Sequence, residues 1–224
     1  MSYFKGWSKL DFIWLFLSNF TILALSIYWG DSILSIISAI AGVINVILVS
    51  KQMISNYYFG IIGVSTYAYI AFQSKLYGDF MLNAFYYLPM QFVGIYMWNK
   101  AKEKSEKNEV ESRLMTNKQR ILLTIISALS IGVYSAVLKI LGGNIPIIDA
   151  TSTVLSVIAM ILMVKQYVEQ WHLWVIINGV SILMWVISLC EGSGDLATLL
   201  MWIIYLLNSV FGLVNWQRAS KKNI

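Results

Sequence analysis

The sequence is short of charge, cysteine, proline and histidine. Only 12% of its 224 residues are charged, whereas soluble domains carry about 25%. In contrast, 58% of the residues are hydrophobic. The single cysteine, Cys190, excludes an internal disulfide and a cysteine-based metal site, and we expect no metal and no other cofactor. The composition therefore predicts a chain whose apolar surface faces lipid.

The apolar residues gather in eight stretches. Each has about 17–23 residues, enough or nearly enough to cross a hydrocarbon core of about 30 Å as a helix. Helices and closed barrels satisfy their backbone hydrogen bonds in lipid, and continuous apolar runs are unlike the alternating strands of a barrel. The sequence therefore predicts an all-α integral membrane protein with eight transmembrane helices. They span residues 12–29, 33–50, 56–74, 80–98, 121–141, 147–164, 171–190 and 196–216.

The placement of basic residues predicts the orientation. All but two of the sixteen lysines and arginines lie at helix ends that share one side of the membrane if the eight helices alternate. The exceptions are Lys75 and Lys139. By the positive-inside rule, both termini and the charged loop over residues 99–120 are cytoplasmic. That loop also carries four glutamates, so we expect membrane lipid and no nucleic acid around these charges.

An internal repeat relates the two halves, because segment 31–98 aligns with segment 149–216. The shared pattern Y-x6-G-x3-W closes both copies. The matched pairs are Asp31 with Asp149, Lys51-Gln52 with Lys165-Gln166, Gly78-Asp79 with Gly194-Asp195, and Tyr87, Gly94 and Trp98 with Tyr205, Gly212 and Trp216.

The repeat is a unit of three helices, and an odd unit that starts outside ends inside. Since the charges orient both copies the same way, one extra crossing must separate them, and the stretch 121–141 supplies it. Parallel repeats of this kind occur in the SWEET sugar transporters. We therefore expect a SWEET-like 3+1+3 parallel repeat with an extra N-terminal helix. The expected segments are that helix (1–30), repeat one (31–99), a cytoplasmic charged loop (100–119), a linker helix (120–145), repeat two (146–218) and a cytoplasmic tail (219–224).

Four aspartates precede predicted helices. Ion-coupling carboxylates are one interpretation, and N-caps are the one we favour, because the side-chain oxygen of aspartate accepts hydrogen bonds from the free amides of a first turn. The residues are Asp31, Asp79, Asp149 and Asp195.

The seventh stretch carries an aromatic and polar stripe. Trp171, Trp174 and Asn178 are spaced i, i+3 and i+7, which places them on one helical face, and Ser181 and Trp185 extend it. An interfacial aromatic belt with a helix–helix hydrogen bond would explain Trp171. Trp174 and Asn178 lie deeper, where an amide needs a partner, so we interpret them as facing a solute.

The fourth stretch carries a second polar set around Pro89, which removes a backbone donor and can kink the helix. An amide beside a kink and a glycine, here Gly94, is suited to a polar pocket, although a structural contact between the repeats would explain any one residue as well. The candidates on this stretch are Asn83, Tyr86 or Tyr87, and Gln91; those elsewhere are Asn45, Trp202, Tyr205 and Asn208.

No lysine, arginine, aspartate or glutamate lies near the middle of a crossing, and the one histidine, His172, lies at an edge. The sequence offers no nucleophile–base pair, metal-ligand spacing or phosphate loop, so we do not expect an enzyme. Aromatic faces and amides suit a neutral or cationic aromatic solute. The lack of an intramembrane carboxylate also argues against proton coupling.

Two motifs resemble those of a known family. One is W-x-x-W-x-x-x-N at Trp171, Trp174 and Asn178, with Glu169 just upstream. The other is N-x-x-Y at Asn83 and Tyr86, followed by Pro-Met-Gln-Phe-Val-Gly over residues 89–94 and by Trp98. On these residues the chain resembles the PnuC family of bacterial vitamin transporters.

The resemblance implies a SWEET-like homotrimer in the bacterial plasma (inner) membrane. It implies facilitated diffusion of nicotinamide riboside, which a cytoplasmic kinase then traps by phosphorylation. Other members carry thiamine or riboflavin, and thiamine is also a cationic aromatic; the Pro-Met-Gln-Phe stretch is similar to the nicotinamide riboside branch. A sugar transporter of the same fold and a membrane enzyme or scaffold are the remaining alternatives.

Overall fold

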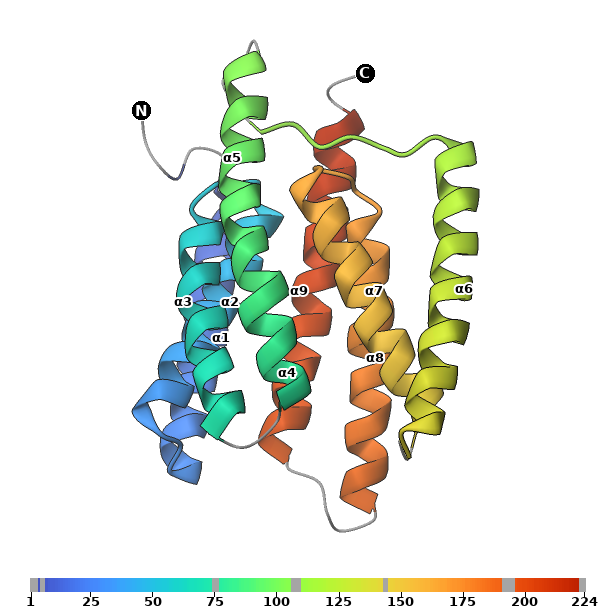
Figure 1. Cartoon of the computed structure of the whole chain (residues 1–224). Coiled ribbons are helices and arrows are strands. Elements are labelled where there is room, and N and C mark those ends of the chain that lie inside the picture. The colour runs from blue at the N-terminus through green and yellow to red at the C-terminus, as the bar shows by residue number, and fades with distance from the viewer. Residues whose placement is uncertain are drawn as a thin grey trace. The chain divides into compact units, whose positions relative to one another are not determined.

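The computed structural model describes residues 4, 7–73, 77–105, 110–142, 145–190 and 196–221, which form helices and connecting turns without a strand (Figure 1). The all-α prediction is confirmed. The helices are α1 (Lys9–Trp29), α2 (Ile33–Ser50), α3 (Asn56–Gln73), α4 (Tyr77–Leu82), the π-helical turn η1 (Asn83–Tyr87), α5 (Leu88–Lys104), α6 (Asn117–Ile140), α7 (Pro146–Val164), α8 (Gln170–Cys190) and α9 (Leu196–Lys221).

These elements match the eight predicted stretches to within a few residues at most ends, because α4, η1 and α5 follow one another without a break. Within the described part of the chain, five helices are long and apolar enough to cross a membrane. They are α1, α2, α6, α7 and the Leu199–Ser220 part of α9.

Large apolar side chains cover the outer faces of these helices. On α6, Ile121, Leu129 and Val133 each expose more than 60% of their surface. Soluble monomers rarely expose contiguous apolar surfaces of this kind, whereas lipid-facing helices must. The chain is therefore an integral membrane protein.

The chain divides into two compact units. Unit one comprises Met1–Val49 and Ser55–Gln91. Within it, α3 packs closely on α2, because Gly63 lets the two backbones approach and the Ser38 hydroxyl donates to the Gly63 carbonyl at 3.1 Å. A β-carbon at position 63 would lie 3.4 Å from the Gly42 amide nitrogen, in van der Waals contact with the backbone of α2.

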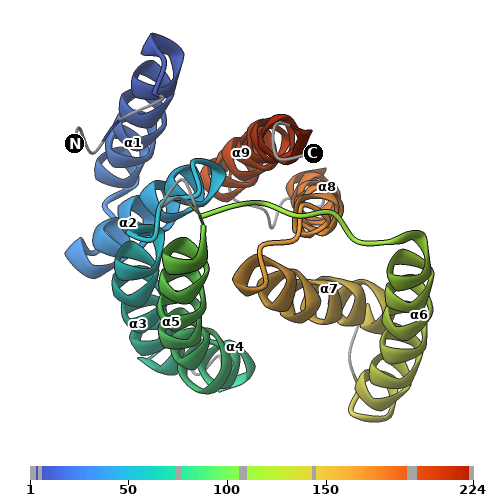
Figure 2. The ribbon, with the colours of Figure 1, turned by 90° about the horizontal axis from the view of Figure 1, so that it is seen from above.

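Unit two comprises Ser50–Ile54 and Phe92–Ile224. Its helices pack in chain order, α6 on α7, α7 on α8 and α8 on α9 (Figure 2). Leu155, Ala159 and Ile177 form a buried apolar centre, against which Leu173 and Trp174 pack.

An extended segment, residues 110–116, connects α5 to α6 and is held on the turn between α7 and α8. The Arg113 amide donates to the Gln166 carbonyl, and the Val168 amide donates to the Arg113 carbonyl, each at 3.0 Å. The Glu169 carboxylate accepts from the Met115 amide at 3.1 Å and from Arg120 Nε at 2.9 Å. We call residues 110–116 the strap.

Local features recur at matched positions of the two sequence copies. Gln52 and Gln166 both follow a helix with a left-handed backbone, φ being 56° and 61°, a conformation in which non-glycine residues are uncommon. Asn56 and Gln170 are the first residues of α3 and α8, and both are fully buried. The repeat seen in the sequence therefore has local structural counterparts, while the parallel relation of the copies stays a prediction.

The N-cap prediction is wrong for the described aspartates. Ser32 and not Asp31 caps α2, since its hydroxyl accepts from the Ser35 amide at 3.1 Å. Asp79 and Asp149 lie inside the first turns of α4 and α7, where their negative charge interacts favourably with the positive end of the helix dipole. The fourth residue, Asp195, and its neighbour Gly194 lie outside the described residues.

Candidate functional site

The polar centre of unit one begins at the π-helical turn η1. The Leu88 amide bonds the Asn83 carbonyl, five residues back, and the next residue, Pro89, has no amide hydrogen to donate. A π turn inserts one extra residue per turn and is frequent at functional sites. It presents Tyr86 and Tyr87 side by side, with ring centroids 5.3 Å apart. The predicted interruption at Pro89 thus takes the form of a widened turn.

Gly60 makes room for two amides from neighbouring helices. A β-carbon there would overlap Gln91 Oε1 and would lie 2.8 Å from Asn45 Nδ2. Gly60 on α3 is therefore a glycine that lies beside these two amides, while the role expected of Gly94 stays a prediction. The groups come from α2, α3 and the first turn of α5.

The amides of unit one share one hydrogen-bond direction. Asn45 Nδ2 donates to the Asn56 carbonyl at 2.7 Å, Asn83 Nδ2 to the Asp79 carbonyl at 2.8 Å, and Gln91 Nε2 to the Tyr87 carbonyl at 3.2 Å. A backbone carbonyl only accepts, so each contact requires the nitrogen at that position. The side-chain oxygen of Gln91, a residue that is 96% buried, has no hydrogen-bond partner among the described residues.

Unit two has the same arrangement around Asn178. Its Nδ2 donates to Ser209 Oγ at 2.8 Å, and the Ser209 hydroxyl donates in turn to the Tyr205 carbonyl at 2.9 Å. Since the serine hydrogen is committed to a carbonyl, its oxygen must accept, which fixes the orientation of the amide. The helix–helix hydrogen bond that the sequence allowed is present, and the amide oxygen of Asn178 points away from it.

Aromatic rings lie on the same two helices. Trp202 and Tyr205 of α9 meet edge to face at a centroid distance of 5.9 Å and are half-buried, one to two turns from the buried Asn208. Trp174 of α8 is half-buried against the apolar centre. The structure thus brings the α9 candidates together and places Trp174 one turn from Asn178. The side chain of Trp185 lies outside what the structure describes.

Trp171 belongs to a different group, a tryptophan cluster. Its ring meets Trp216 at a centroid distance of 6.0 Å, and Trp216 meets Trp98 at 5.9 Å. All three are almost fully buried, and Gly212 lies directly beneath the Trp171 ring. Trp98 and Trp216 are the tryptophans that end the two sequence copies, so the Y-x6-G-x3-W pattern has a packing role at this end of unit two. A solute contact by Trp171 stays a prediction.

Sequence reasoning missed Gln170. It is 0% exposed, and neither amide atom has a partner among the described residues. A buried amide left unsatisfied costs about 1–3 kcal/mol, so its retention requires an explanation. The internal repeat could have pointed to Gln170, because this residue matches Asn56 of the first copy. Each of these amides directly precedes a buried aromatic residue.

The chemistry available to these groups is recognition. Among the described residues, no three histidine, cysteine, aspartate or glutamate side chains gather as metal ligands. Aromatic rings and carbonyl oxygens of amides bind hydroxyls, amide N–H groups and cations. Apolar helices that carry such uncharged polar groups into a membrane suit the passage of a polar solute.

Comparisons with known proteins identify the class more closely. Residues 32–218 match the family model described as "Nicotinamide mononucleotide transporter". The chain therefore belongs to this family of membrane transporters.

Its relatives support the assignment over nearly the whole chain. The nicotinamide riboside transporter PnuC of Neisseria mucosa is 38% identical over 98% of this chain and 85% of its own. That of Haemophilus influenzae is 35% identical over 97% and 94%. A solved structure titled "Crystal structure of the Vitamin B3 transporter PnuC" is 36% identical, covers 98% of this chain and 95% of its own, and superposes with a TM-score of 0.82. The resemblance seen in the sequence is confirmed.

The tryptophan cluster yields a test of packing. Gly212→Ala places a methyl group in the Trp171 ring and should cost about 1–3 kcal/mol of stability, measured as a lower melting temperature in detergent. The matched control is Gly179→Ala on α8, where a β-carbon meets nothing within 4 Å and helix propensity favours alanine. Equal melting temperatures for the two variants would refute the close approach of Trp171 to α9.

Proposed function

We propose that this protein transports nicotinamide riboside by facilitated diffusion. The observation that carries the proposal is the shared direction of four amides, each of which commits its side-chain nitrogen to the protein, so that its oxygen is the group that can face a solute: Asn45, Asn83, Gln91 and Asn178. Nicotinamide riboside offers matching groups, namely ribose hydroxyls, a carboxamide N–H and a cationic aromatic ring. The relatives named above are nicotinamide riboside transporters.

The choice between riboside and mononucleotide follows from charge. The family description names the mononucleotide, which carries a phosphate. Tight binding of a phosphate needs arginine, lysine or a cluster of amide donors. The polar centres of both units contain no lysine or arginine. The unphosphorylated riboside is therefore the better match.

The solute-binding groups form two sets, one in each unit. In unit one we assign Asn45, Asn83, Gln91 and the tyrosine pair Tyr86 and Tyr87 to recognition. In unit two we assign Trp174, Asn178, Trp202, Tyr205 and Asn208, with Trp171 as their support. Each set is open to separate tests by substitution.

The orientation and cellular setting are part of the same proposal. The basic helix ends and both termini face the cytoplasm of a bacterial inner membrane, and the protein assembles as a homotrimer. The sequence places no charged residue near the middle of a crossing, where ion coupling would need one, so transport is passive. Phosphorylation of the riboside by a cytoplasmic kinase then makes net uptake irreversible.

Transport is tested with purified protein in liposomes that enclose a riboside kinase and ATP. Labelled nicotinamide riboside should accumulate as the phosphorylated product, and omission of ATP should abolish the accumulation beyond equilibration. Uptake of thiamine without uptake of nicotinamide riboside would contradict the proposal and would identify the protein as a thiamine transporter.

The proposed site is tested by equilibrium binding to purified variants. Asn178→Leu should weaken nicotinamide riboside binding by about tenfold, since a polar contact in a dry site is worth about 1.4 kcal/mol or more. Asn19→Leu on α1 is the matched control, because Asn19 likewise donates its side-chain amide within the protein, in its case to the Leu15 carbonyl, and its oxygen is buried without a partner among the described residues.

The control should bind as the unmodified protein does. Unchanged affinity of Asn178→Leu, or an equal loss in both variants, would remove Asn178 from the solute site.

A further inference from the structure

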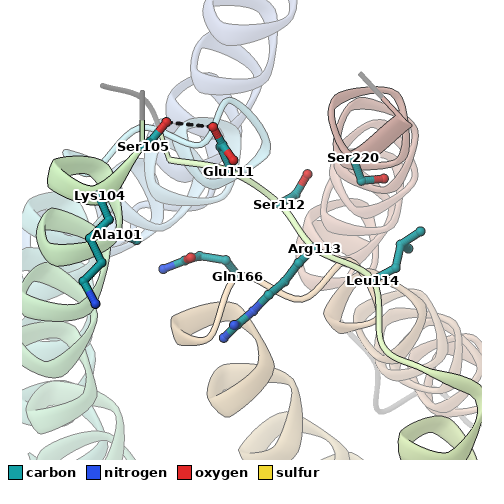
Figure 3. Close-up of a pocket in the computed structure, with 9 residues that line it drawn as sticks. All are labelled: Ala101, Lys104, Ser105, Glu111, Ser112, Arg113, Leu114, Gln166 and Ser220. Carbon is teal, nitrogen blue, oxygen red and sulfur yellow. Dashed lines mark hydrogen bonds between the residues drawn. The ribbon is translucent and has the colours of Figure 1, made fainter. Parts of the chain in front are cut away.

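A polar pocket lies beneath the strap, at the end of unit two where the charged residues gather (Figure 3). Its volume is about 580 Å³, within the range of small-molecule sites. Four parts of unit two line it: the end of α5, the strap, the turn after α7, and the end of α9. The polar residues on its walls are Lys104, Ser105, Glu111, Arg113, Gln166 and Ser220.

Arg113 is held rigidly at this pocket. Its Nε donates to the Lys165 carbonyl at 2.8 Å, and its guanidinium lies 4.5 Å above the Tyr167 ring. These contacts leave its two terminal nitrogens without an acceptor among the described residues. A guanidinium whose side chain is already ordered loses little entropy when it binds an anion.

The carboxylate in the wall does not neutralise Arg113. Glu111 accepts from the Ser105 hydroxyl at 2.7 Å and is turned away from the guanidinium (Figure 3). Lys104 on α5 forms no ion pair within the described part of the chain. Among the described residues that line the pocket, two cations stand against one carboxylate.

Gln166 supplies an oriented amide. It is 92% buried, and its left-handed backbone is fixed by two bonds, from its own amide to the Met163 carbonyl and from the Tyr167 amide to the Leu162 carbonyl, each 2.9 Å. Its side chain reaches across the pocket toward α5 (Figure 3) and forms no hydrogen bond with the described residues. The left-handed backbone of Gln166 is explained by its place at a helix end, since Gln52 has the same backbone conformation at the end of α2. The helix end does not explain why the side-chain amide of Gln166 points into the pocket.

We propose that this pocket binds a phosphate-bearing anion. Arg113, Lys104 and the Gln166 amide together offer donors from three sides, the pattern that phosphate oxygens require. The volume accommodates a phosphate with an attached group, either a soluble nucleoside monophosphate or the headgroup of an anionic phospholipid. This site goes beyond the proposed transport function and does not rest on it, because none of its residues belongs to the two solute-binding sets.

The soluble ligand is tested by calorimetric titration of the detergent-purified protein with adenosine monophosphate, adenosine and inorganic phosphate at low ionic strength. The monophosphate should bind, adenosine should not, and both Arg113→Gln and Lys104→Gln should weaken binding about tenfold or more. Arg113→Gln removes the hydrogen bond to the Lys165 carbonyl and can loosen the strap. Lys104→Gln removes no such bond, so a loss of binding in this variant reports on the ligand contact itself. Arg218→Gln, an exposed cation of α9 outside the pocket, is the matched control.

The lipid source is tested in nanodiscs of phosphatidylglycerol or phosphatidylcholine. Phosphatidylglycerol should raise the melting temperature of the unmodified protein and not that of Arg113→Gln or Lys104→Gln, if the phosphate is that of a lipid. Binding in neither arm, or equal losses in Arg218→Gln, would overturn the proposal. Nicotinamide riboside binding should be unchanged in Lys104→Gln, which separates this pocket from the solute sites.

Discussion

A buried amide in an apolar membrane must find a hydrogen-bond partner, and this constraint organises both units. The amide nitrogens of Asn45, Asn83, Gln91 and Asn178 each donate to an oxygen that has to accept. The bonds of Asn45 and Asn178 join neighbouring helices, whereas those of Asn83 and Gln91 close on carbonyls four residues back in the same helical segment. A solute rich in hydroxyls and N–H groups completes the hydrogen bonding that the fold leaves open.

The two sequence copies share their packing and differ where recognition is expected. Gln52 and Gln166 end the first helix of each copy, and Tyr57 and Trp171 are both buried at the start of the second. One turn and two turns further on, α3 has Gly60 and Val64 where α8 has Trp174 and Asn178. Gly60 gives its space to amides from other helices, whereas α8 carries its own polar groups. The two copies therefore keep the same packing residues at the ends of their helices and differ at the positions where α8 carries its aromatic and polar side chains. A repeated bundle can thus contain a binding site that is not repeated.

Sequence patterns predicted what depends on local composition. The apolar stretches predicted the helices, because backbone hydrogen bonds in lipid leave few other structures, and Pro89 predicted an interruption. The π form of that turn, the contact of Gly60 with Gln91 and the enclosure of Trp171 by Gly212 depend on how distant helices meet, and no spacing along one helix reports them. The strap is a further case: its bond between Arg113 and Gln166 joins residues that no periodicity relates.

The central claim is that uncharged groups recognise the solute and that transport is passive. The most direct measurement is the steady-state distribution of labelled nicotinamide riboside across liposomes that lack a kinase, with the membrane potential held at zero and a proton or sodium gradient imposed. The account predicts equal concentrations inside and outside, reached faster than in protein-free liposomes. Accumulation above the outside concentration under either gradient would contradict it.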